Sequence, residues 1–588
     1  MTDTKQSRLT ATLLCVTPPD EHQEQGIRAF LQKKYGEDVA LTIQQDSSLK
    51  SGFQLHVGSE VYDWSAKGRM EQFRQQVEQL VAKNTRKDII PLLRSSIDEF
   101  RLLAKSSEVG TVKSIGDGIA VVEGLEHAAY GEILMFDNGI KGMVQDLRRN
   151  ETGCILFDNA DDISAGSKVA RTGKTAGVPV GDAFLGRVVD ALGRPIDGGD
   201  AIPADGYRPV EEPAPGIIDR QSVDTPMETG LLSIDAMFPI GRGQRELIIG
   251  DRQTGKTAIA LDAMLNQKGK NVICVYVAIG QKASSVAQLV ENLRKRDAMD
   301  YCVVVSATAG EADTMQYIAP YAGCAMAEYY MHKGRDVLIV YDDLSKHAIA
   351  YRAMSLLLER APGREAYPGD VFYLHSRLLE RSCRMRDDLG GGSITALPIV
   401  ETQAGDVSAY IPTNIISITD GQIFLESDLF FAGQRPAVNV GLSVSRVGGA
   451  AQTKATKKAT GSLRLDLAQY REMEVFTQFS SDLDDSTKEQ LHYGQGLMRI
   501  LRQKQYHPLS MHQQVIVLVC AMGHVLSKVA VKDVTDFRDA LLDHFEQEHS
   551  DLCRSLEDEK VLTDDMKQEI LRIAEEYLAA NAERFRKE

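Results

Sequence analysis

The sequence has few features of a membrane-spanning or secreted protein. In its 588 residues we find no apolar run long enough to cross a bilayer, and the N-terminal stretch does not read as a signal peptide. If the protein works at a membrane, we expect other chains to hold it there. The eight cysteines are scattered and no pair has the spacing of metal ligands, which favours reduced thiols in a cytosolic setting.

Positive charge is in short supply as well. The chain has 67 lysines and arginines against 83 aspartates and glutamates, which gives a net charge of −16. This balance argues against a surface that binds nucleic acid throughout. The length predicts several domains, and 43% hydrophobic and 26% charged residues are typical of soluble globular proteins.

One motif organises the chain. Residues 250–257 fit the phosphate-loop pattern G-x-x-x-x-G-K-[ST], between an apolar segment at 247–249 and a good helix former at 258–265. Backbone N–H groups of such a loop close around phosphate oxygens, the lysine reaches the β/γ-phosphates and the hydroxyl ligates Mg²⁺. We therefore expect ATP and Mg²⁺ as ligands, bound by Gly250, Asp251, Arg252, Gln253, Thr254, Gly255, Lys256 and Thr257.

A phosphate loop needs an acid for its metal. The apolar run 336–341 ends in Asp342, which we predict to lie at a strand tip and to hold the Mg²⁺ shell together with Thr257. An aspartate at a strand end is also a common turn residue, and only its pairing with the loop favours the metal role.

The distribution of apolar, turn-forming and helical patterns along the chain predicts a multidomain α/β protein. Residues 1–82 suggest a small α/β module, with strands at 11–16, 39–44 and 53–57, a helix at 21–34 and an amphipathic helix around 70–81. Residues 83–107 suggest a tether and docking helix. Short strands broken by Gly, Asn and Asp predict a β-barrel over 108–181.

The remaining sequence divides in two. Residues 182–455 alternate apolar strands with helical patterns, as in a parallel sheet covered on both faces; the strands we predict are 246–249, 272–278, 301–306, 336–341 and 415–419. Residues 456–588 predict a C-terminal helical domain.

Several ordered motifs resemble the α subunit of F-type (rotary) ATP synthase, over roughly residue 90 to the end. They are the phosphate loop and the stretches 239–245, 341–346, 362–370 and 436–446. The resemblance implies a crown barrel, a RecA-like P-loop nucleotide-binding domain and a helical domain. It also implies a ring of alternating α and β subunits around a γ shaft, on the cytoplasmic face of the cell membrane, driven by a proton or sodium gradient.

The resemblance also assigns residues. In catalytic β subunits a glutamate follows a glycine after the strand that succeeds the phosphate loop; here Gln281 follows Gly280 and cannot act as a base near neutral pH. Some GTPases orient water with a glutamine, so the α-type motifs decide the interpretation. Arg446 resembles the arginine finger that α inserts into the neighbouring β site. The adenine side is expected at Phe430, Arg435, Pro436, Gln503 and Gln505, and Ser417 close to the catalytic boundary.

The first module resembles the C-terminal domain of the ATP synthase δ subunit, in the order Asp46, Leu49, Gly52, Phe53, Gly58, Asp63, Ser65, Gly68, Arg69 and Met70. Lys50 and Ser51 depart from the apolar residue and glycine usual there. A δ–α fusion follows, in which this module links the ring to the b subunits of the peripheral stalk.

Two other function classes fit the phosphate loop. A self-sufficient hexameric ATPase of protein-export type would need a carboxylate where Gln281 stands. A ring translocase on nucleic acid would need a recognisable RNA-binding module and a less acidic balance.

Overall fold

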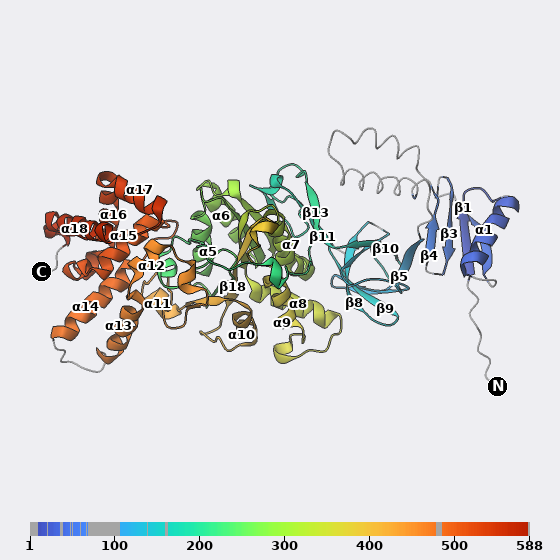
Figure 1. Ribbon diagram of the computed structural model, residues 1–588. Coiled ribbons are helices and arrows are strands. Elements are labelled where there is room, and N and C mark those ends of the chain that lie inside the picture. Colours follow the sequence, from blue (N-terminus) through green and yellow to red (C-terminus); the bar gives the residue numbers. More distant parts are fainter. Residues whose placement is uncertain are drawn as a thin grey trace, which may run out of the picture. The chain divides into compact units, whose positions relative to one another are not determined.

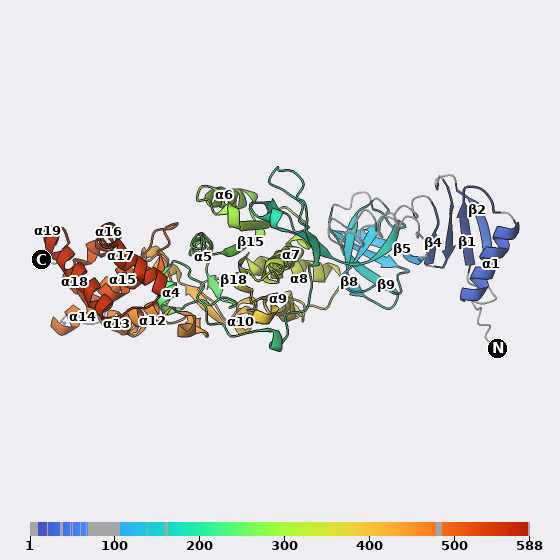
Figure 2. The same ribbon diagram turned by 45° about the horizontal axis from the view of Figure 1, so that its top comes forward.

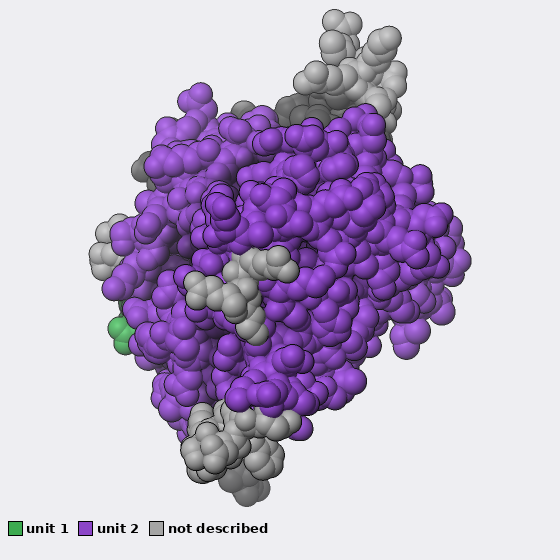
Figure 3. All heavy atoms as spheres, turned by 90° about the vertical axis from the view of Figure 1, so that its left-hand side faces the viewer, with its two compact units in different colours: residues 1–176 green, residues 177–588 purple. Residues whose placement is uncertain are grey.

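The computed structural model describes residues 10–19, 21–35, 39–46, 49, 51–58, 60–65, 68, 106–137, 139–158, 163–477 and 485–585. The chain divides into two compact units, residues 1–176 and residues 177–588 (Figure 3). The amphipathic helix predicted around 70–81 and almost all of the tether lie outside the described residues. Among the described helices, none has the length and apolar character needed to cross a membrane.

The first unit begins with a small α/β module. Helix α1 (Glu21–Tyr35) packs on strands β1 (Thr10–Cys15), β2 (Ala40–Gln45), β3 (Phe53–Val57) and β4 (Glu60–Asp63). Strand β1 pairs parallel with β2 and antiparallel with β3, so it lies at the centre of this part of the sheet (Figure 1). Alternate residues face α1, and the buried core comprises Ala11, Leu13, Leu31, Leu55, Val57 and Tyr62.

The same unit ends in a closed six-stranded barrel, as predicted. Its strands are β5 (Ser106–Gly116), β6 (Ile119–Glu123), β7 (Glu132–Phe136), β8 (Lys141–Leu147), β9 (Glu151–Leu156) and β10 (Lys168–Thr175). The order is β10-β7-β8-β9-β6-β5, and pairing of β10 with β5 closes the ring, which removes exposed strand edges. The first residues of β5 also pair with β4, Val61 opposite Ser107.

The second unit is built on a twisted sheet in the order β12-β16-β15-β17-β18-β14-β19-β20, parallel except for β20. Its main strands are buried almost throughout: β14 (Leu247–Gly250), β15 (Val272–Gln281), β16 (Cys302–Thr308), β17 (Asp336–Asp342), β18 (Ser393–Glu401) and β19 (Gly421–Leu425). The edge strands are short, β12 (Val188–Val189) and β20 (Val444–Ser445), and β11 (Gly177–Val180) pairs separately with β13 (Gly206–Pro209).

Helices cover both faces of this sheet. In Figure 2, α5 (Lys256–Leu265) and α6 (Ala283–Arg294) lie above the strands, and α7 (Asp313–Met331), α8 (Leu344–Leu357) and α9 (Val371–Leu379) lie below them. Helix α4 (Leu232–Met237) precedes β14 and is buried at every position. This is the doubly covered parallel sheet that the apolar runs predicted.

One predicted strand is wrong. Residues 415–418 belong to helix α10 (Tyr410–Ile418), Thr419 is its C-cap, and the strand, β19, begins at Gly421. The buried residues Ile411, Ile415 and Ile418 recur at helical spacing, whereas the short stretch rich in isoleucine and threonine suggested a strand.

The C-terminal part is helical, as predicted. Its helices are α12 (Lys454–Thr460), α13 (Leu463–Thr477), α14 (Asp485–Ile500), α15 (Met511–Met522), α16 (Val534–Glu548), α17 (Ser550–Glu559), α18 (Asp564–Ala580) and α19 (Ala582–Phe585). The helix before them, α11 (Ser427–Phe431), still belongs to the nucleotide-binding part. Helix α15 is the central one, because residues from Gln514 to Ala521 are buried. A Ser510–Gln513 capping box fixes where it starts.

Candidate functional site

The phosphate loop joins strand β14 to helix α5, as the motif predicted. Gly250 ends the strand, and a Cβ there would lie 2.5 Å from the carbonyl oxygen of Leu425 on β19. Gly255 precedes the helix with φ +96°, a left-handed conformation that favours glycine. Sequence and local geometry therefore agree on a tight loop between strand β14 and helix α5.

Lys256 is enclosed by the loop itself. Its Nζ donates to the carbonyl oxygens of Gly250 at 2.9 Å and Asp251 at 2.6 Å, and the residue is only 7% exposed. Burial lowers the pKa of Lys256, and the carboxylates of Glu401, Asp343, Asp342 and Asp251 oppose that shift. The ammonium is thus held at the centre of the loop, among acids contributed by the loop itself and by the ends of strands β17 and β18.

Asp342 is the hub of the site. Its Oδ2 accepts hydrogen bonds from Thr257 Oγ1 at 2.7 Å and from Tyr276 OH at 2.6 Å, and its Oδ1 accepts from Gln281 Nε2 at 2.9 Å. Thr257, Gln281 and Asp342, which were predicted from different motifs, therefore meet at one carboxylate. Tyr276 was missed by the sequence analysis, although it lies on the strand β15 that pairs with β17.

Burial raises the pKa values of two groups next to Asp342, the Tyr276 phenol and the Asp343 carboxyl group. Burial raises the pKa of Tyr276 well above its ordinary value, and the adjacent Asp342 adds to that, so the phenol stays a donor. The neighbouring Asp343 is buried, which raises its pKa to about 6 against the opposing charge of Lys346. Asp343 caps helix α8 by accepting from Lys346 N at 2.8 Å, so the second acid has a structural role.

The oxygen donors at this hub suit a hard cation. A carboxylate oxygen of Asp342 and the hydroxyl of Thr257, 2.7 Å apart, are the type of ligands that Mg²⁺ takes from proteins, with substrate phosphates completing its shell. The residues present therefore fit the metal that the motif implies.

Asp251 and Arg252, both within the phosphate loop, differ in role. Asp251 Oδ1 accepts from Thr402 Oγ1 at 2.7 Å and Gly405 N at 2.9 Å, which anchors the loop to the segment after β18. The side chain of Arg252 is 81% exposed and pairs with Glu401 at 3.0 Å. Thr254 is buried and donates to the Asp251 carbonyl at 2.8 Å, while Gln253 has φ +64°.

The residues expected on the adenine side are partly gathered. Half-buried Phe430 on α11 lies against the loop, since a Cβ on Gly255 would be 3.8 Å from its ring, and the guanidinium of Arg435 stacks over the same ring at 4.4 Å. A cis peptide joins Arg435 to Pro436. Gln503 N donates to the Arg435 carbonyl at 2.9 Å, which brings the helical part to this corner.

The amide of Gln503 is already used within the chain. Its Oε1 accepts from Leu232 N at 2.7 Å, and its Nε2 donates to the Gly230 carbonyl at 2.9 Å. Gln505 is exposed beside it. A contact of either glutamine with a base stays a prediction.

Arg446 lies at the other end of the sheet. It follows β20, which pairs antiparallel with the start of β19, Ser445 opposite Gly421, whereas Gly250 is paired with Leu425 at the end of β19. Four residues of strand separate the two positions, about 13 Å. Arg446 is exposed, and no hydrogen bond or ion pair joins its guanidinium to the residues that the structure describes. Ser417, on α10, is exposed and donates to the Asn414 carbonyl at 2.7 Å.

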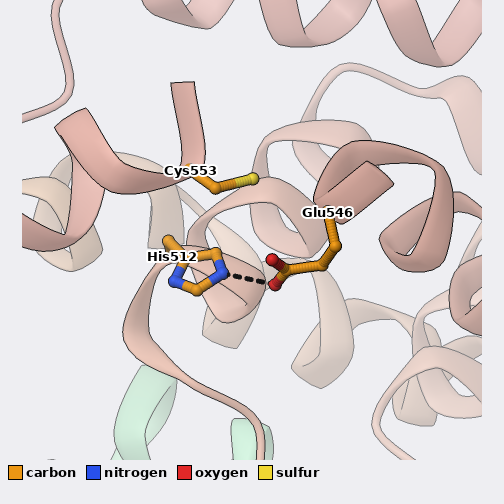
Figure 4. A group of neighbouring side chains, drawn as sticks. All are labelled: His512, Glu546 and Cys553. Atoms are coloured by element: carbon orange, nitrogen blue, oxygen red, sulfur yellow. Dashed lines mark hydrogen bonds and ion pairs between the residues drawn. The ribbon is translucent and has the colours of Figure 1, made fainter. Parts of the chain in front are cut away.

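A third cluster, on the helical part, joins His512, Glu546 and Cys553, whose potential ligand atoms lie within 4.8 Å of one another (Figure 4). His512 Nε2 contacts Glu546 Oε1 at 2.7 Å and its Nδ1 contacts Glu557 Oε2 at 2.9 Å. Burial would lower the pKa of His512, but the two carboxylates outweigh it and raise the pKa. Both ring nitrogens thus face a carboxylate oxygen, which favours the protonated ring over one that offers a lone pair to a metal.

Four family models match stretches of the chain. Residues 230–445 match the ATP synthase alpha/beta family, nucleotide-binding domain; residues 452–577 the C-terminal domain of the ATP synthase alpha/beta chain; and residues 105–173 the family's beta-barrel domain. Residues 1–77 match the ATP synthase delta (OSCP) subunit.

Individual relatives are similar over most of their length. The ATP synthase subunit alpha of Clostridium botulinum (strain Hall) is 57% identical over 483 residues, which is 82% of this chain and 96% of the relative. The ATP synthase subunit alpha of Clostridium kluyveri (strain NBRC 12016) is 55% identical over 490 residues, 83% of this chain and 97% of the relative.

Proposed function

The chain belongs to the ATP synthase alpha/beta family, and from that premise we propose that it is the non-catalytic, regulatory nucleotide-binding α subunit of an F-type ATP synthase. The enzyme makes ATP from ADP and phosphate with a transmembrane proton or sodium gradient. The chain carries an N-terminal δ-type module ahead of the α-type domains, as a fusion of the two. We propose the β subunit, the γ shaft and the stalk b subunits as its partners, and the cytoplasmic face of the cell membrane as its place of work.

The chain's own site is proposed to hold Mg-ATP without splitting it. The loop N–H groups and Lys256 would bind the phosphates, and Thr257 with Asp342 would hold the metal, which screens phosphate charge when bound. Gln281, at 2.9 Å from Asp342, orients that carboxylate and has no basic form near neutral pH. Tyr276 bonds the same carboxylate from the other side, so Asp342 has little freedom to act as a base.

The register of the sheet carries the second half of the proposal. Arg446 stands about four strand residues away from the phosphate loop of its own chain, at the opposite end of β19. Its exposed guanidinium is therefore available to another chain, where it would act as an arginine finger on the γ-phosphate of an adjacent β site. Such a charge stabilises the transition state and is worth on the order of 10³–10⁵ in rate.

The test is Arg446→Ala in a ring assembled with β and γ subunits. Nucleotide bound to this chain should remain, because Arg446 is remote from its loop, while steady ATP turnover of the ring should fall by on the order of 10³-fold or more. Arg294→Ala is the matched control, at an exposed arginine of helix α6 in the same domain that belongs to neither site. A ring with Arg446→Ala and normal turnover would refute the finger role.

The N-terminal module is proposed to link the ring to the peripheral stalk. It carries a groove of about 760 Å³, lined mainly by apolar residues of β1, α1 and β3, among them Leu13, Ile27, Phe30, Phe53 and Trp64. A groove of this kind accepts the apolar face of a helix. Gly26 on α1 lines it, and a Cβ there meets nothing within 4 Å.

That opening allows a substitution which fills the groove without straining the fold. Gly26→Trp should leave ring ATPase intact and reduce its coupling to ion pumping in membrane vesicles. Gln32→Trp, an exposed position of α1 outside the groove, is the control. Full coupling with Gly26→Trp would remove the groove from the proposal.

The rival reading as a self-sufficient ATPase of protein-export type is the weaker one, because it needs a carboxylate where Gln281 stands. We keep the five predicted parts as a proposal: 1–82 stator module, 83–107 tether, 108–181 crown barrel, 182–455 nucleotide-binding domain and 456–588 helical domain.

A further inference from the structure

Residues 244–246, which lead into strand β14, hold the short strand β20, directly before Arg446. Gln244 Nε2 donates to Ser445 Oγ at 3.2 Å and to Glu246 Oε2 at 2.7 Å. Ser445 Oγ in turn donates to the Pro239 carbonyl at 2.9 Å and accepts from Gly448 N at 3.2 Å. The residue just before Arg446 is therefore bonded on several sides, and Gln244 supplies one of those bonds.

The next residue of the same segment holds the other flank. Arg245 binds the Asp420 carboxylate through its backbone N at 3.0 Å and its Nη2 at 2.9 Å. The backbone N of Arg446 donates to the Asp420 carbonyl at 2.8 Å. Consecutive residues of one segment, Gln244 and Arg245, thus hold Ser445 and Asp420, the two groups that fix the backbone at Arg446.

Close packing leaves this corner no room to shift. Gln244 and Glu246 are both fully buried. A Cβ on Gly421 would lie 2.5 Å from Glu246 Oε2 and 2.3 Å from the Val444 carbonyl oxygen. The glycine lets the carboxyl group of Glu246 fit beneath β20, where it holds the Gln244 amide against Ser445.

The charge of the Glu246 carboxyl group matters because a buried carboxylate would attract the Arg446 guanidinium into the fold. Burial raises the pKa of Glu246 well above its ordinary value, Asp420 adds to the rise, and Gln244 and Arg446 oppose it. Burial therefore disfavours the charged form of Glu246, which weakens the pull of this carboxyl group on the guanidinium. Asp420, the other acid at this corner, is already paired with Arg245.

We propose that Gln244, supported by Glu246, is a positioning residue for Arg446: through the hydroxyl of Ser445 it fixes the direction in which the guanidinium leaves the sheet. This inference rests on the proposed function, in which Arg446 acts at a neighbouring site. It adds residues that touch neither nucleotide nor the reacting atoms, yet set the geometry of a group that does.

The test uses rings assembled with β and γ subunits. Ser445→Ala removes only the hydroxyl, and Gln244→Leu removes its partner. Each should lower kcat by on the order of 10-fold to 100-fold, the cost of a misplaced catalytic group, at unchanged KM and unchanged nucleotide content of this chain. Ser445→Thr keeps the hydroxyl and should restore kcat to within about threefold. The control is Ser306→Ala, a buried serine of β16 whose hydroxyl has no partner among the described residues.

Non-additivity separates positioning from general damage. In an Arg446→Ala ring, with hydrolysis followed at substoichiometric ATP, adding Ser445→Ala should change the rate by less than twofold, since nothing remains to be positioned. Normal kcat in Ser445→Ala, or an equal loss in the Arg446→Ala background, would overturn the proposal. If Arg446→Ala alone kept normal turnover, the proposed function would fail first, and the two failures are thus distinguishable.

Discussion

Two cationic side chains occupy opposite ends of the central sheet, and their surroundings differ. Lys256 is buried, with its ammonium bonded to two carbonyls of its own loop and four carboxylates nearby. Arg446 is exposed and has no ion pair with the described residues, although its backbone is held firmly. The proposed roles match this difference: Lys256, proposed to serve its own chain, is surrounded by that chain, whereas Arg446, proposed to serve a partner, is held through its backbone and has an exposed guanidinium.

Among the variants that test this comparison, Arg446→Lys should have the largest effect on ATP turnover. Lysine keeps the charge but loses the planar fork that binds phosphate oxygens in pairs. Turnover of the assembled ring should fall by on the order of 10²-fold, measured as steady ATP hydrolysis. Turnover equal to the parent would mean that charge alone, without the fork, accounts for the role of this position.

Lys256→Ala should selectively impair the chain's own nucleotide site, at the phosphate loop. Loss of the ammonium should weaken Mg-ATP binding to this chain by about 10-fold to 100-fold, as expected for a charged hydrogen bond to phosphate. Ring turnover should fall less than the binding does if, as we propose, the active sites lie on the β subunits. Binding is measured by equilibrium dialysis on the isolated chain, and an equal loss of binding and turnover would contradict the separation of the two ends.

Gln281→Glu places a second carboxylate against Asp342 in place of the 2.9 Å amide bond. The lost hydrogen bond and the like charges should cost about 1–3 kcal/mol of stability at this site, measured by denaturant unfolding without nucleotide. The variant should gain no brisk turnover in the isolated chain, because Arg446 of the same chain stands at the far end of the sheet. Brisk ATP turnover would show that a carboxylate at position 281 is all that this site lacks compared with a catalytic site.

The smallest effect is expected far from both cations, at His512. Its pKa is raised in the fold by Glu557 and Glu546, so its contribution to stability is complete below the unfolded value near 6.5 and is lost as the pH rises through the folded value. The apparent Tm should therefore fall more between pH 6 and pH 9 in the parent than in His512→Gln. His507→Gln, at an exposed histidine, should leave the pH dependence unchanged.

Sequence reasoning reached the loop, the acid at the tip of β17 and the barrel because each depends on local pattern. The strand predicted at 415–419 failed because an apolar run fits a helix and a strand equally well until its burial is known. Tyr276, and the contact by which Asp251 of the predicted loop is bonded to Thr402, were beyond reach for another reason. Their roles depend on partners 66 and 151 residues away, which only the register of the sheet brings together.

The arginine shows the same limit more sharply. The motif around residues 436–446 pointed to Arg446, but the sequence could not place it at the opposite end of β19 from the phosphate loop. Gln503 is a second case: the motif suggested a base contact, while the fold uses its amide to bond Gly230, 273 residues away. Spacing identifies which side chains are chemically capable, and strand register decides what they face.

The central claim is that this chain holds ATP without splitting it and lends a cation to the next site. The most direct measurement follows Mg-ATP binding and ATP turnover in one sample of the isolated chain, then turnover after β and γ subunits are added. We expect saturable binding with turnover at least about 10³-fold below that of the assembled ring. Brisk turnover by the isolated chain, or no gain on assembly, would contradict the account.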